Sequence, residues 1–141
     1  MSEGYGFIRN CIVSAIDPDS KIFIGGSTTI EGGLIASTEG KLIYIGKDCM
    51  ISDKCEIRNG DSHAIYNNDG ERINTASSII LQNHVWLGSN VKVLKGSVIP
   101  SGCVIGNSSI VTKKLDEPNS IYVGFPCNTF VRKNVTWTRE R

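Results

Sequence analysis

The sequence predicts an all-β fold, a left-handed parallel β-helix, because aliphatic side chains recur at every sixth position through two long blocks. A period of six fits neither the 3.6 residues of a helical turn nor the alternation of a strand, so each unit needs a short strand and a turn. Compact side chains stand four positions after the aliphatic ones, where they also point inward. The aliphatic positions are Ile45, Ile51, Ile57, Leu81, Leu87, Val93, Ile99, Ile105 and Val111, and the compact ones are Cys49, Cys55, Val85, Val91, Ser97, Cys103 and Ser109.

Three such units make one triangular coil, and about five coils fit between residues 20 and 115 of a single domain, residues 1–141. A short carboxyl-terminal extension begins at about residue 118. An earlier, weaker block places Ile24 and Ile30 six positions apart, but not in phase with Ile45. The residues between Ile30 and Ile45 must therefore depart from the six-residue spacing. Glycines follow three of the aliphatic residues, where a tight corner favours a residue without Cβ: Gly46, Gly88 and Gly106.

Outward residues that lie one or two coils apart share a face of the helix, and two of the three faces then carry apolar rows. An exposed apolar row usually marks an interface. Two different faces imply a heterologous contact that closes as a ring, so the sequence predicts a cyclic oligomer. The three rows are Tyr44, Ile80 and Val98; Met50, Trp86 and Val104; and Glu56, Lys92 and Ile110.

Composition argues against several partners and locations. Fifteen Lys and Arg against 14 Asp and Glu leave a formal net charge of +1, which gives no global field for nucleic acid or anionic membrane. No stretch approaches the roughly 20 apolar residues of a membrane span, and the amino terminus does not resemble a signal peptide. We therefore expect a soluble cytoplasmic protein that binds no nucleic acid and does not insert into membranes. Five cysteines without CxxC spacing indicate buried core thiols instead of disulfides or a zinc site.

The six-residue pattern fails at GDSHAIYNNDG, residues 60–70, which contains one of the two histidines. His63 and Asp69 stand where aliphatic side chains would continue the wall. A polar excursion on a solenoid is a typical place for a binding or catalytic site. We therefore expect a protruding loop around residues 61–78.

Several motifs in this order resemble those of the hexapeptide-repeat O-acetyltransferases: RNGDSHAIYNNDGERIN, then HVWLGS, then SIVTK, then GFPC. The resemblance covers about residues 42–137. It is similar to the galactoside and maltose acetyltransferases and, in the Asp-x-His element, to transferases that acetylate bacterial capsule and O-antigen sugars. It implies direct transfer of an acetyl group from acetyl-CoA to a hydroxyl of a surface polysaccharide or its precursor. It also implies a homotrimer with active sites between subunits, and no metal.

The resemblance implies that His63 is the general base, because a sugar hydroxyl is a poor nucleophile and a neutral imidazole can take its proton. Trp86 matches a tryptophan that borders the acceptor and the reactive end of the cofactor, while its place in an apolar row equally suits an interface. Asp61 fixes the loop or the imidazole tautomer, or else simply forms a turn after Gly60. Asn74 matches a family position and is a candidate acceptor-binding residue.

The resemblance places acetyl-CoA in a groove along the later coils. Lys113 would supply a point charge for the 3′-phosphate, and a merely solvated lysine is the alternative. The chain departs from the family at Asn128, where Lys or Arg is common, and Arg132 or Lys133 is the candidate substitute. The cofactor-binding candidates are Trp86, Ser89, Ser109, Thr112, Lys113 and Arg132.

Three other functions use the same fold. A γ-class carbonic anhydrase holds zinc with three histidines, but this chain has only His63 and His84, which leaves a zinc site one ligand short. An amino-sugar N-acetyltransferase would keep the coenzyme and change the acceptor. A non-catalytic β-helix scaffold would use residues 61–78 only to bind a partner. Release of CoA with sugar hydroxyls, with amino sugars or with neither separates these alternatives.

Overall fold

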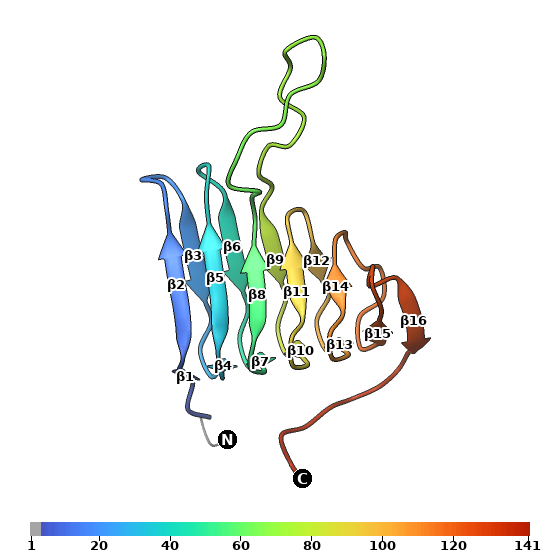
Figure 1. The fold of residues 1–141 in the computed structure, drawn as a ribbon. Coiled ribbons are helices and arrows are strands. Elements are labelled where there is room, and N and C mark those ends of the chain that lie inside the picture. Colours follow the sequence, from blue (N-terminus) through green and yellow to red (C-terminus); the bar gives the residue numbers. More distant parts are fainter. Residues whose placement is uncertain (1–3) are drawn as a thin grey trace.

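The computed structural model describes residues 4–141, which form a β-helix of short strands and contain no helix (Figure 1). These residues therefore hold no helix with the length and apolarity needed to cross a membrane. The predicted all-β fold, a left-handed parallel β-helix, is confirmed. The strands are β1 (Phe7–Ile8), β2 (Cys11–Ala15), β3 (Lys21–Ile24), β4 (Thr29–Ile30), β5 (Gly33–Ser37), β6 (Leu42–Ile45), β7 (Met50–Ile51), β8 (Cys55–Arg58), β9 (Ile79–Leu81), β10 (Trp86–Leu87), β11 (Lys92–Leu94), β12 (Val98–Ile99), β13 (Val104–Ile105), β14 (Ile110–Val111), β15 (Ile121–Val123) and β16 (Thr129–Arg132).

Three sheets, A, B and C, form the faces of the prism. Their strand orders are β1-β4-β7-β10-β13-β15-β16 in sheet A, β14-β11-β8-β5-β2 in sheet B and β12-β9-β6-β3 in sheet C. In sheet A, Trp86 pairs with both Met50 and Val104, which confirms that predicted row. The rows of the other two sheets are confirmed by their pairings as well.

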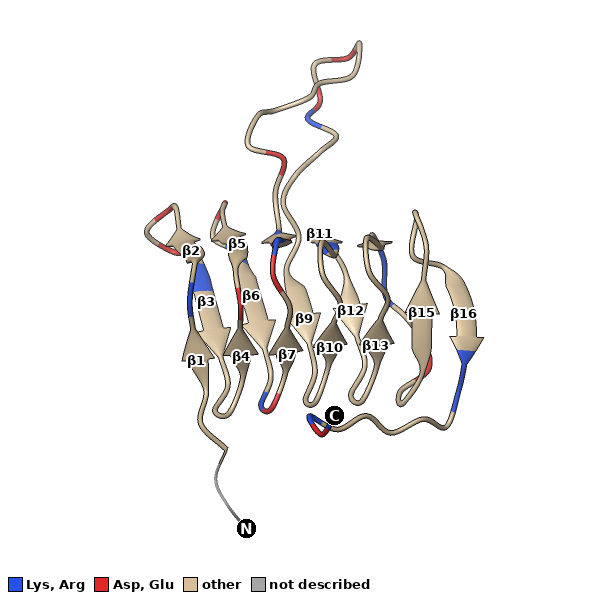
Figure 2. Ribbon diagram, turned by 60° about the horizontal axis from the view of Figure 1, so that its bottom comes forward, with Lys and Arg blue, Asp and Glu red and all other residues tan. Residues whose placement is uncertain are grey.

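The outer surfaces of the three sheets differ in polarity. Strands β4, β7, β10 and β13 of sheet A carry no charged residue (Figure 2). On sheet C, the ring of Phe23 stacks on that of Tyr44 with their centroids 5.0 Å apart, which extends the apolar row by one coil. On sheet B, Glu56 and Lys92 lie 3.9 Å apart as an ion pair. The outward row of sheet B therefore contains a charged pair between Leu34 and Ile110, whereas the predicted rows of sheets A and C contain no charged residue.

Inward aliphatic side chains fill the centre of the prism, and all nine predicted ones are buried. Each such burial contributes roughly 1.5–3 kcal/mol, so the stack is held mainly by this column. Four of the five cysteines are buried in the same core, Cys11 is partly buried, and none forms a disulfide. Burial raises the pKa of the Cys55 thiol to about 11 and that of Cys127 to about 11. The predicted core role of the buried thiols is confirmed.

The glycines after the aliphatic residues have a different cause from the predicted one. The left-handed backbone conformation occurs two residues later, for example at Asp48 with φ 54°. A Cβ on Gly46 would instead lie 2.7 Å from the carbonyl oxygen of Gln82 in the next coil. Close approach between coils, not the corner conformation, therefore requires glycine at this position.

The predicted phase shift arises because the early coils are longer than the late ones. Thr29 pairs with Met50, which is 50 − 29 = 21 positions away. Trp86 pairs with Val104, which is 104 − 86 = 18 positions away. The additional residues of the early coils lie between strands, so the inward pattern of each strand is preserved.

After β15 the chain leaves the repeat. Strand β16 pairs antiparallel with β15, and residues 133–141, here called the carboxyl-terminal strap, run back beside sheet A (Figures 1 and 2). The N–H of Val135 donates to the carbonyl oxygen of Asn119 over 2.9 Å. Arg139 Nη1 donates to Thr29 Oγ1 over 2.7 Å. The strap thus connects the last coil to β4 near the other end of the stack.

Candidate functional site

A loop of residues 59–78 leaves the stack between β8 and β9 and projects from one edge of the prism, as predicted (Figure 1). An antiparallel bridge between Tyr66 and Arg72 joins its two arms. Large apolar side chains on the loop are exposed: Ile65 by 53%, Tyr66 by 62% and Ile73 by 63%. Such a cluster is typical of a surface that packs against another molecule.

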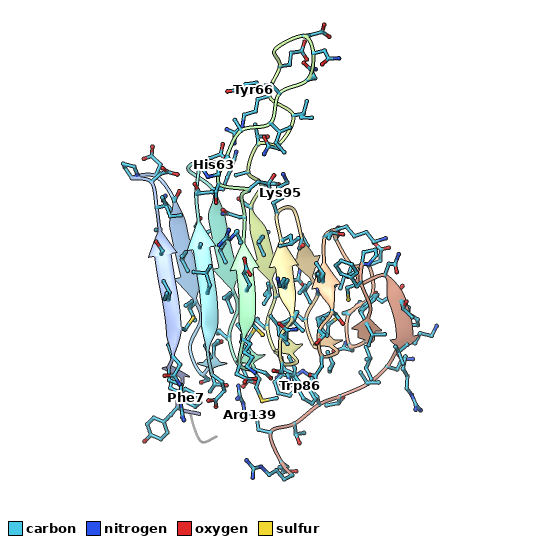
Figure 3. The ribbon with its side chains drawn as sticks, viewed as in Figure 1. Phe7, His63, Tyr66, Trp86, Lys95 and Arg139 are labelled. Carbon is cyan, nitrogen blue, oxygen red and sulfur yellow. The ribbon has the colours of Figure 1, made fainter. Side chains whose placement is uncertain are left out.

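His63 lies at the base of this loop with its side chain exposed (Figure 3). A tight turn holds its backbone, because its N–H donates to the carbonyl oxygen of Asp61 over 2.8 Å and Ser62 adopts φ 70°. Within residues 4–141 the imidazole makes no hydrogen bond. Both ring nitrogens are therefore accessible to a ligand or to a second chain.

Asn74 fixes the backbone on both sides of His63. Its side-chain nitrogen donates to the carbonyl oxygen of His63 over 2.8 Å, and its side-chain oxygen accepts from the N–H of Ile65 over 2.7 Å. The same nitrogen lies 3.1 Å from the carboxylate of Asp61. Asn74 is buried, so the polar atoms expected to face an acceptor are engaged within the loop.

Charged pairs attach the loop to the stack. Asp61 forms an ion pair with Lys95. Lys95 lies in the corner after β11, near the base of the loop (Figure 3). The hydrogen bond from Lys95 is the main cause that holds the pKa of Asp61 below its usual value. Arg72 pairs in the same way with Glu39. The carboxylate of Asp61 therefore contacts the loop and the stack and does not contact the imidazole.

Trp86 lies on the outer face of sheet A, far across the prism from His63 (Figure 3). Its indole Nε1 is buried and has no hydrogen-bond partner within residues 4–141. A buried N–H without an acceptor costs roughly 1–3 kcal/mol, which favours a partner from outside the chain. One chain does not bring His63 and Trp86 together, so a site that uses both needs two copies of the chain.

Trp137 of the strap packs beside Trp86, with ring centroids 6.0 Å apart and planes tilted by 51°. On its other side the ring stacks on His84 at 3.8 Å and 4°. Trp137 Nε1 donates to the carbonyl oxygen of His84 over 2.9 Å, and His84 Nε2 lies 2.9 Å from the carbonyl oxygen of Trp137. His84 Nδ1 lies 2.7 Å from the carboxylate of Asp48. The second histidine thus anchors the strap.

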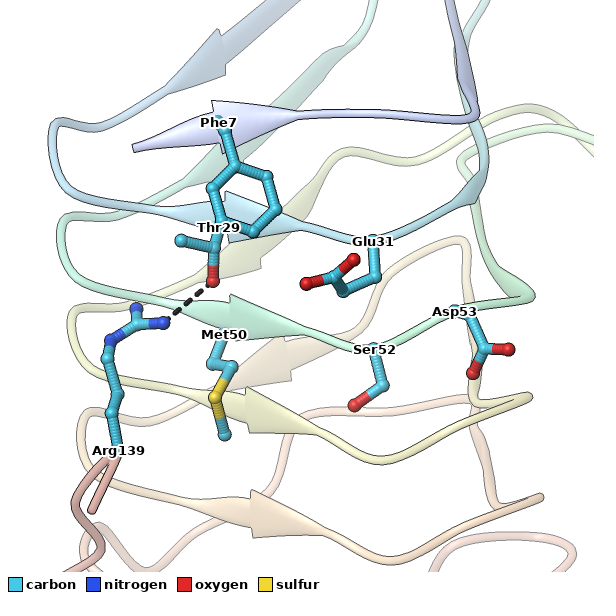
Figure 4. Close-up of a pocket in the computed structure, with 7 residues that line it drawn as sticks. All are labelled: Phe7, Thr29, Glu31, Met50, Ser52, Asp53 and Arg139. Atoms are coloured by element: carbon cyan, nitrogen blue, oxygen red, sulfur yellow. Dashed lines mark hydrogen bonds between the residues drawn. The ribbon is translucent and has the colours of Figure 1, made fainter. Parts of the chain in front are cut away.

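An open groove of about 510 Å³ lies on sheet A, on the amino-terminal side of Trp86 (Figure 4). Arg139 forms one wall, where its Nη2 donates to the carbonyl oxygen of Cys49 over 3.0 Å. Sequence reasoning missed this groove because Arg139 follows the last coil and obeys no repeat. A tryptophan and an arginine close together after the repeats were the only available signal. The lining residues are Phe7, Thr29, Glu31, Met50, Ser52, Asp53 and Arg139.

The predicted cofactor residues lie on the later coils but at different corners. The Ser89 and Ser109 hydroxyls are engaged: Ser89 Oγ donates to the carboxylate of Asp53 over 2.5 Å, and Ser109 Oγ accepts from the N–H of Gly124 over 3.1 Å. A ligand could therefore bind these serines through their backbone groups, or through hydroxyl lone pairs that these bonds do not use. Ser89 and Ser109 lie between sheets A and B, Thr112 and Lys113 between sheets B and C, and Arg132 on β16.

A second pocket, of about 270 Å³, lies near the carboxyl end of the stack and contains Lys113, Lys114 and Asn128 in its lining. Asp116 and Glu117 line the same pocket. The two lysines and the two acidic residues balance in formal charge, so only a direct contact with a lysine would favour the phosphate that the resemblance places at Lys113. Within residues 4–141, no three His, Cys, Asp or Glu side chains lie together as a metal site.

Comparison with known proteins identifies close sequence relatives, although no protein-family model matches the chain. The polysialic acid O-acetyltransferase of Neisseria meningitidis is 46% identical over 86 residues, covering 60% of this chain and 40% of that protein. The polysialic acid O-acetyltransferase of Escherichia coli O1:K1 / APEC is 39% identical over 121 residues, covering 85% of this chain and 39% of that protein. The chain therefore spans less than half the length of these relatives.

Solved structures show the same architecture. The polysialic acid O-acetyltransferase OatWY superposes with a TM-score of 0.91 at 39% identity, over 97% of this chain and 64% of that chain. The polySia-specific acetyltransferase NeuO gives a TM-score of 0.78 at 29% identity, over 96% of this chain and 71% of that chain. The Vibrio cholerae hexapeptide-repeat acetyltransferase VCA0836, in complex with acetyl coenzyme A, gives 0.67 at 20% identity, over 93% of this chain and 72% of that chain. At that identity the likeness shows the fold alone.

Proposed function

We propose that this chain, which belongs to the hexapeptide-repeat acetyltransferases, moves an acetyl group from acetyl-CoA to a hydroxyl of a sugar in a bacterial surface polysaccharide or its precursor. One observation carries the proposal: a loop leaves an otherwise regular wall and holds His63 at its base with an open imidazole. The similarity to polysialic acid O-acetyltransferases supports a polymer of acidic sugars as the acceptor class.

In the proposed reaction His63 is the general base. The acceptor hydroxyl oxygen attacks the thioester carbonyl carbon of acetyl-CoA while a neutral imidazole nitrogen removes the hydroxyl proton. The resulting oxyanion is stabilised by N–H donors. Collapse of the intermediate breaks the C–S bond, and the imidazole passes its proton to the departing thiolate. The products are the O-acetylated sugar and CoA, and His63 is neutral again.

The proposed active unit is a homotrimer with a site between neighbouring chains. The apolar outer rows of sheets A and C support a heterologous contact, and the Glu56–Lys92 pair on sheet B suits a solvent face. The exposed apolar side chains of the loop add a second contact surface. In such a ring, the His63 loop of one chain approaches sheet A of the next chain, and thereby Trp86.

Acetyl-CoA is the proposed co-substrate, bound along the later coils. Lys113 is the proposed point charge for the 3′-phosphate, in a pocket whose lining also includes Lys114, Asp116 and Glu117, and Arg132 on β16 is a further cation close in sequence to Asn128. The cytoplasm, which supplies acetyl-CoA, is the proposed location.

A transfer assay tests the function. The purified chain is incubated with acetyl-CoA and three acceptors, namely oligomers of polysialic acid, neutral oligosaccharides and amino sugars. Free CoA and the acetylated product are measured. We expect a product whose acetyl group is removed by mild alkali, because an ester is hydrolysed and an amide is not. An alkali-stable acetyl group on an amino sugar would support N-acetyl transfer, and absence of acetyl-CoA binding would support the scaffold.

A further inference from the structure

The groove on sheet A continues directly from Trp86 toward the amino-terminal end of the stack. Trp86 pairs with Met50, Met50 with Thr29, and β4 with β1, which carries Phe7. The cofactor candidates Ser109, Thr112, Lys113 and Arg132 lie on the other side of Trp86, on the later coils. Ser89 follows Trp86 on the same coil, and its hydroxyl donates to Asp53 of the groove lining. The groove therefore begins where the cofactor path ends.

We infer that this groove is a sugar subsite, that it holds an uncharged, hydroxyl-rich part of the acceptor, and that Arg139 of the strap is its main hydrogen-bond donor. The inference rests on the proposed function, because it requires a sugar acceptor at Trp86. It adds residues outside the loop and outside the motifs that the family resemblance covers.

Arg139 is fixed in the groove wall yet keeps donors for a ligand. Its Nη1 donates to Thr29 Oγ1 over 2.7 Å and its Nη2 to the carbonyl oxygen of Cys49 over 3.0 Å. A guanidinium has five N–H groups, and within residues 4–141 its Nε makes no hydrogen bond. Immobilisation by these contacts lowers the entropic cost of binding a ligand oxygen.

The other lining groups suit a sugar. The Arg9 guanidinium covers one face of the Phe7 ring, 4.0 Å from its centroid, so the opposite face is the proposed apolar surface for the C–H face of a pyranose. Ser52 provides a hydroxyl, and the carboxylates of Glu31 and Asp53 accept hydrogen bonds from sugar hydroxyls. A few polar groups around an apolar patch are typical of small-ligand sites.

The charges around the groove argue against a carboxylate at this position. Arg139 lies 3.4 Å from the carboxylate of Asp48, and Arg9 lies 3.6 Å from that of Glu31. Among the residues that line the groove, Glu31 and Asp53 are acidic and Arg139 is basic. An anionic group bound here would meet a net negative surrounding, which costs free energy. The carboxylate of an acidic sugar must lie elsewhere, and its hydroxylated part occupies the groove.

The two tryptophans provide a direct readout of occupancy. The chain has only two, Trp86 and Trp137, and their rings lie 6.0 Å apart beside the groove. Indole emission responds to the polarity around the ring, so a sugar that enters the groove is expected to change it. This signal is independent of turnover.

The experiment compares Arg139→Gln with the full chain, using oligomers of polysialic acid as the probe. We expect the acceptor KM and the Kd from tryptophan emission to rise about tenfold, which corresponds to ~1.4 kcal/mol, while the KM for acetyl-CoA stays unchanged. Arg139→Lys is expected to recover part of the loss. Arg141→Gln, an exposed arginine of the same strap, serves as the matched control and is expected to change neither constant.

Two further measurements keep the inference falsifiable. Phe7→Ala changes the groove at a residue outside the strap and is expected to raise the acceptor KM as well. Displacement of the strap by the Arg139 substitution could not explain both results. A carboxyl-amidated acceptor is expected to show the same tenfold loss with Arg139→Gln. A loss that disappears on amidation would show that Arg139 binds the carboxylate and would overturn the assignment.

Different results would contradict the assignment of the groove as a sugar subsite and the proposed acetyl transfer. Normal turnover by both variants with unchanged acceptor constants would refute the groove alone. Absence of acetyl transfer by the unsubstituted chain to every sugar would refute the proposed function.

Discussion

The side-chain nitrogen of Asn74 donates a hydrogen bond to the backbone carbonyl oxygen of His63 over 2.8 Å. The oxygen of the same amide accepts from the N–H of Ile65 over 2.7 Å. Asn74 thus holds the backbone before and after the side chain that we propose as the base, and does so without contacting the imidazole.

Asn74→Ala is expected to lower kcat by about 10²-fold, because a displacement of the base by ~1 Å is enough for a loss of this size. The KM for acetyl-CoA and the shape of the pH profile should not change, since the base itself is retained. Asn67→Ala is the matched control, because Asn67 also accepts backbone hydrogen bonds within the loop but away from His63. Equal losses for the two variants would show that loop stability, not the position of His63, limits turnover.

His63→Ala is expected to lower kcat by about 10²–10⁴-fold, which is the usual contribution of a positioned general base. Acetyl-CoA affinity and oligomeric state should be unchanged. Activity of the unsubstituted chain should fall on acidification, because a protonated imidazole cannot accept a proton. Asp69→Ala, at the tip of the same loop, is the control. If the His63 variant keeps more than about a third of kcat, the base lies elsewhere.

The Asp61–Lys95 ion pair is expected to make the loop sensitive to acid. Because the pKa of Asp61 in the folded chain lies below its ordinary value of 3.8, the pair stabilises the loop above about pH 3.8 and loses its effect as the pH falls through the lower folded value. Asp61→Asn should speed amide hydrogen exchange in residues 59–78 at neutral pH. The expected decrease in the free energy of local opening is about 0.2–1 kcal/mol, the usual contribution of an exposed ion pair. Unchanged exchange at neutral pH would mean that the pair contributes nothing to the loop.

Lys113→Ala is expected to weaken acetyl-CoA binding by about tenfold, because a hydrogen bond between charged groups is lost. Binding of 3′-dephospho-acetyl-CoA should be much less affected, since that ligand lacks the proposed partner. Lys41→Ala, on an earlier coil, is the control. Equal weakening of both ligands by the Lys113 substitution would contradict the phosphate assignment.

Ile80→Glu is expected to convert the proposed trimer into monomers, because it places a charge in the apolar outer row of sheet C. Ile110→Glu makes the same change on the outer face of sheet B and should leave the trimer intact. Light scattering measures both, and the unsubstituted chain should have the mass of three chains. A monomer at micromolar concentration, or dissociation only by Ile110→Glu, would rule out the proposed interface.

The wall of the helix was predictable because a six-residue period constrains which side chains face inward. Ile45 and Ile99 are buried by the same local rule, so the pattern can be read without knowing the coil to which each belongs. The place where the loop departs was predictable for the same reason, since His63 and Asp69 break the rule. The proposal that His63 is the base comes from the family resemblance.

The strap and the groove were not predictable because their contacts are long range and aperiodic. Arg139 and Thr29 are 110 positions apart, and nothing in the local sequence of either residue indicates the other. His84 is a similar case, because nothing in its local sequence indicates that Trp137 covers its ring. The contacts of Asn74 within the loop also required the folded chain.

The loop exceeds an ordinary corner by one coil's length. Leu94 pairs with Arg58, and Val98 pairs with Ile80. The connection from sheet B to sheet C therefore advances by 98 − 94 = 4 positions in the later coil and by 80 − 58 = 22 positions in the coil that carries the loop. The difference, 22 − 4 = 18, equals the spacing of Trp86 and Val104 in adjacent coils. Excising 18 residues here would rejoin the wall with every side chain still facing the same way. The loop that carries the proposed base is thus separable from the β-helix, and we expect the shortened chain to fold and to lack the proposed acetyl transfer.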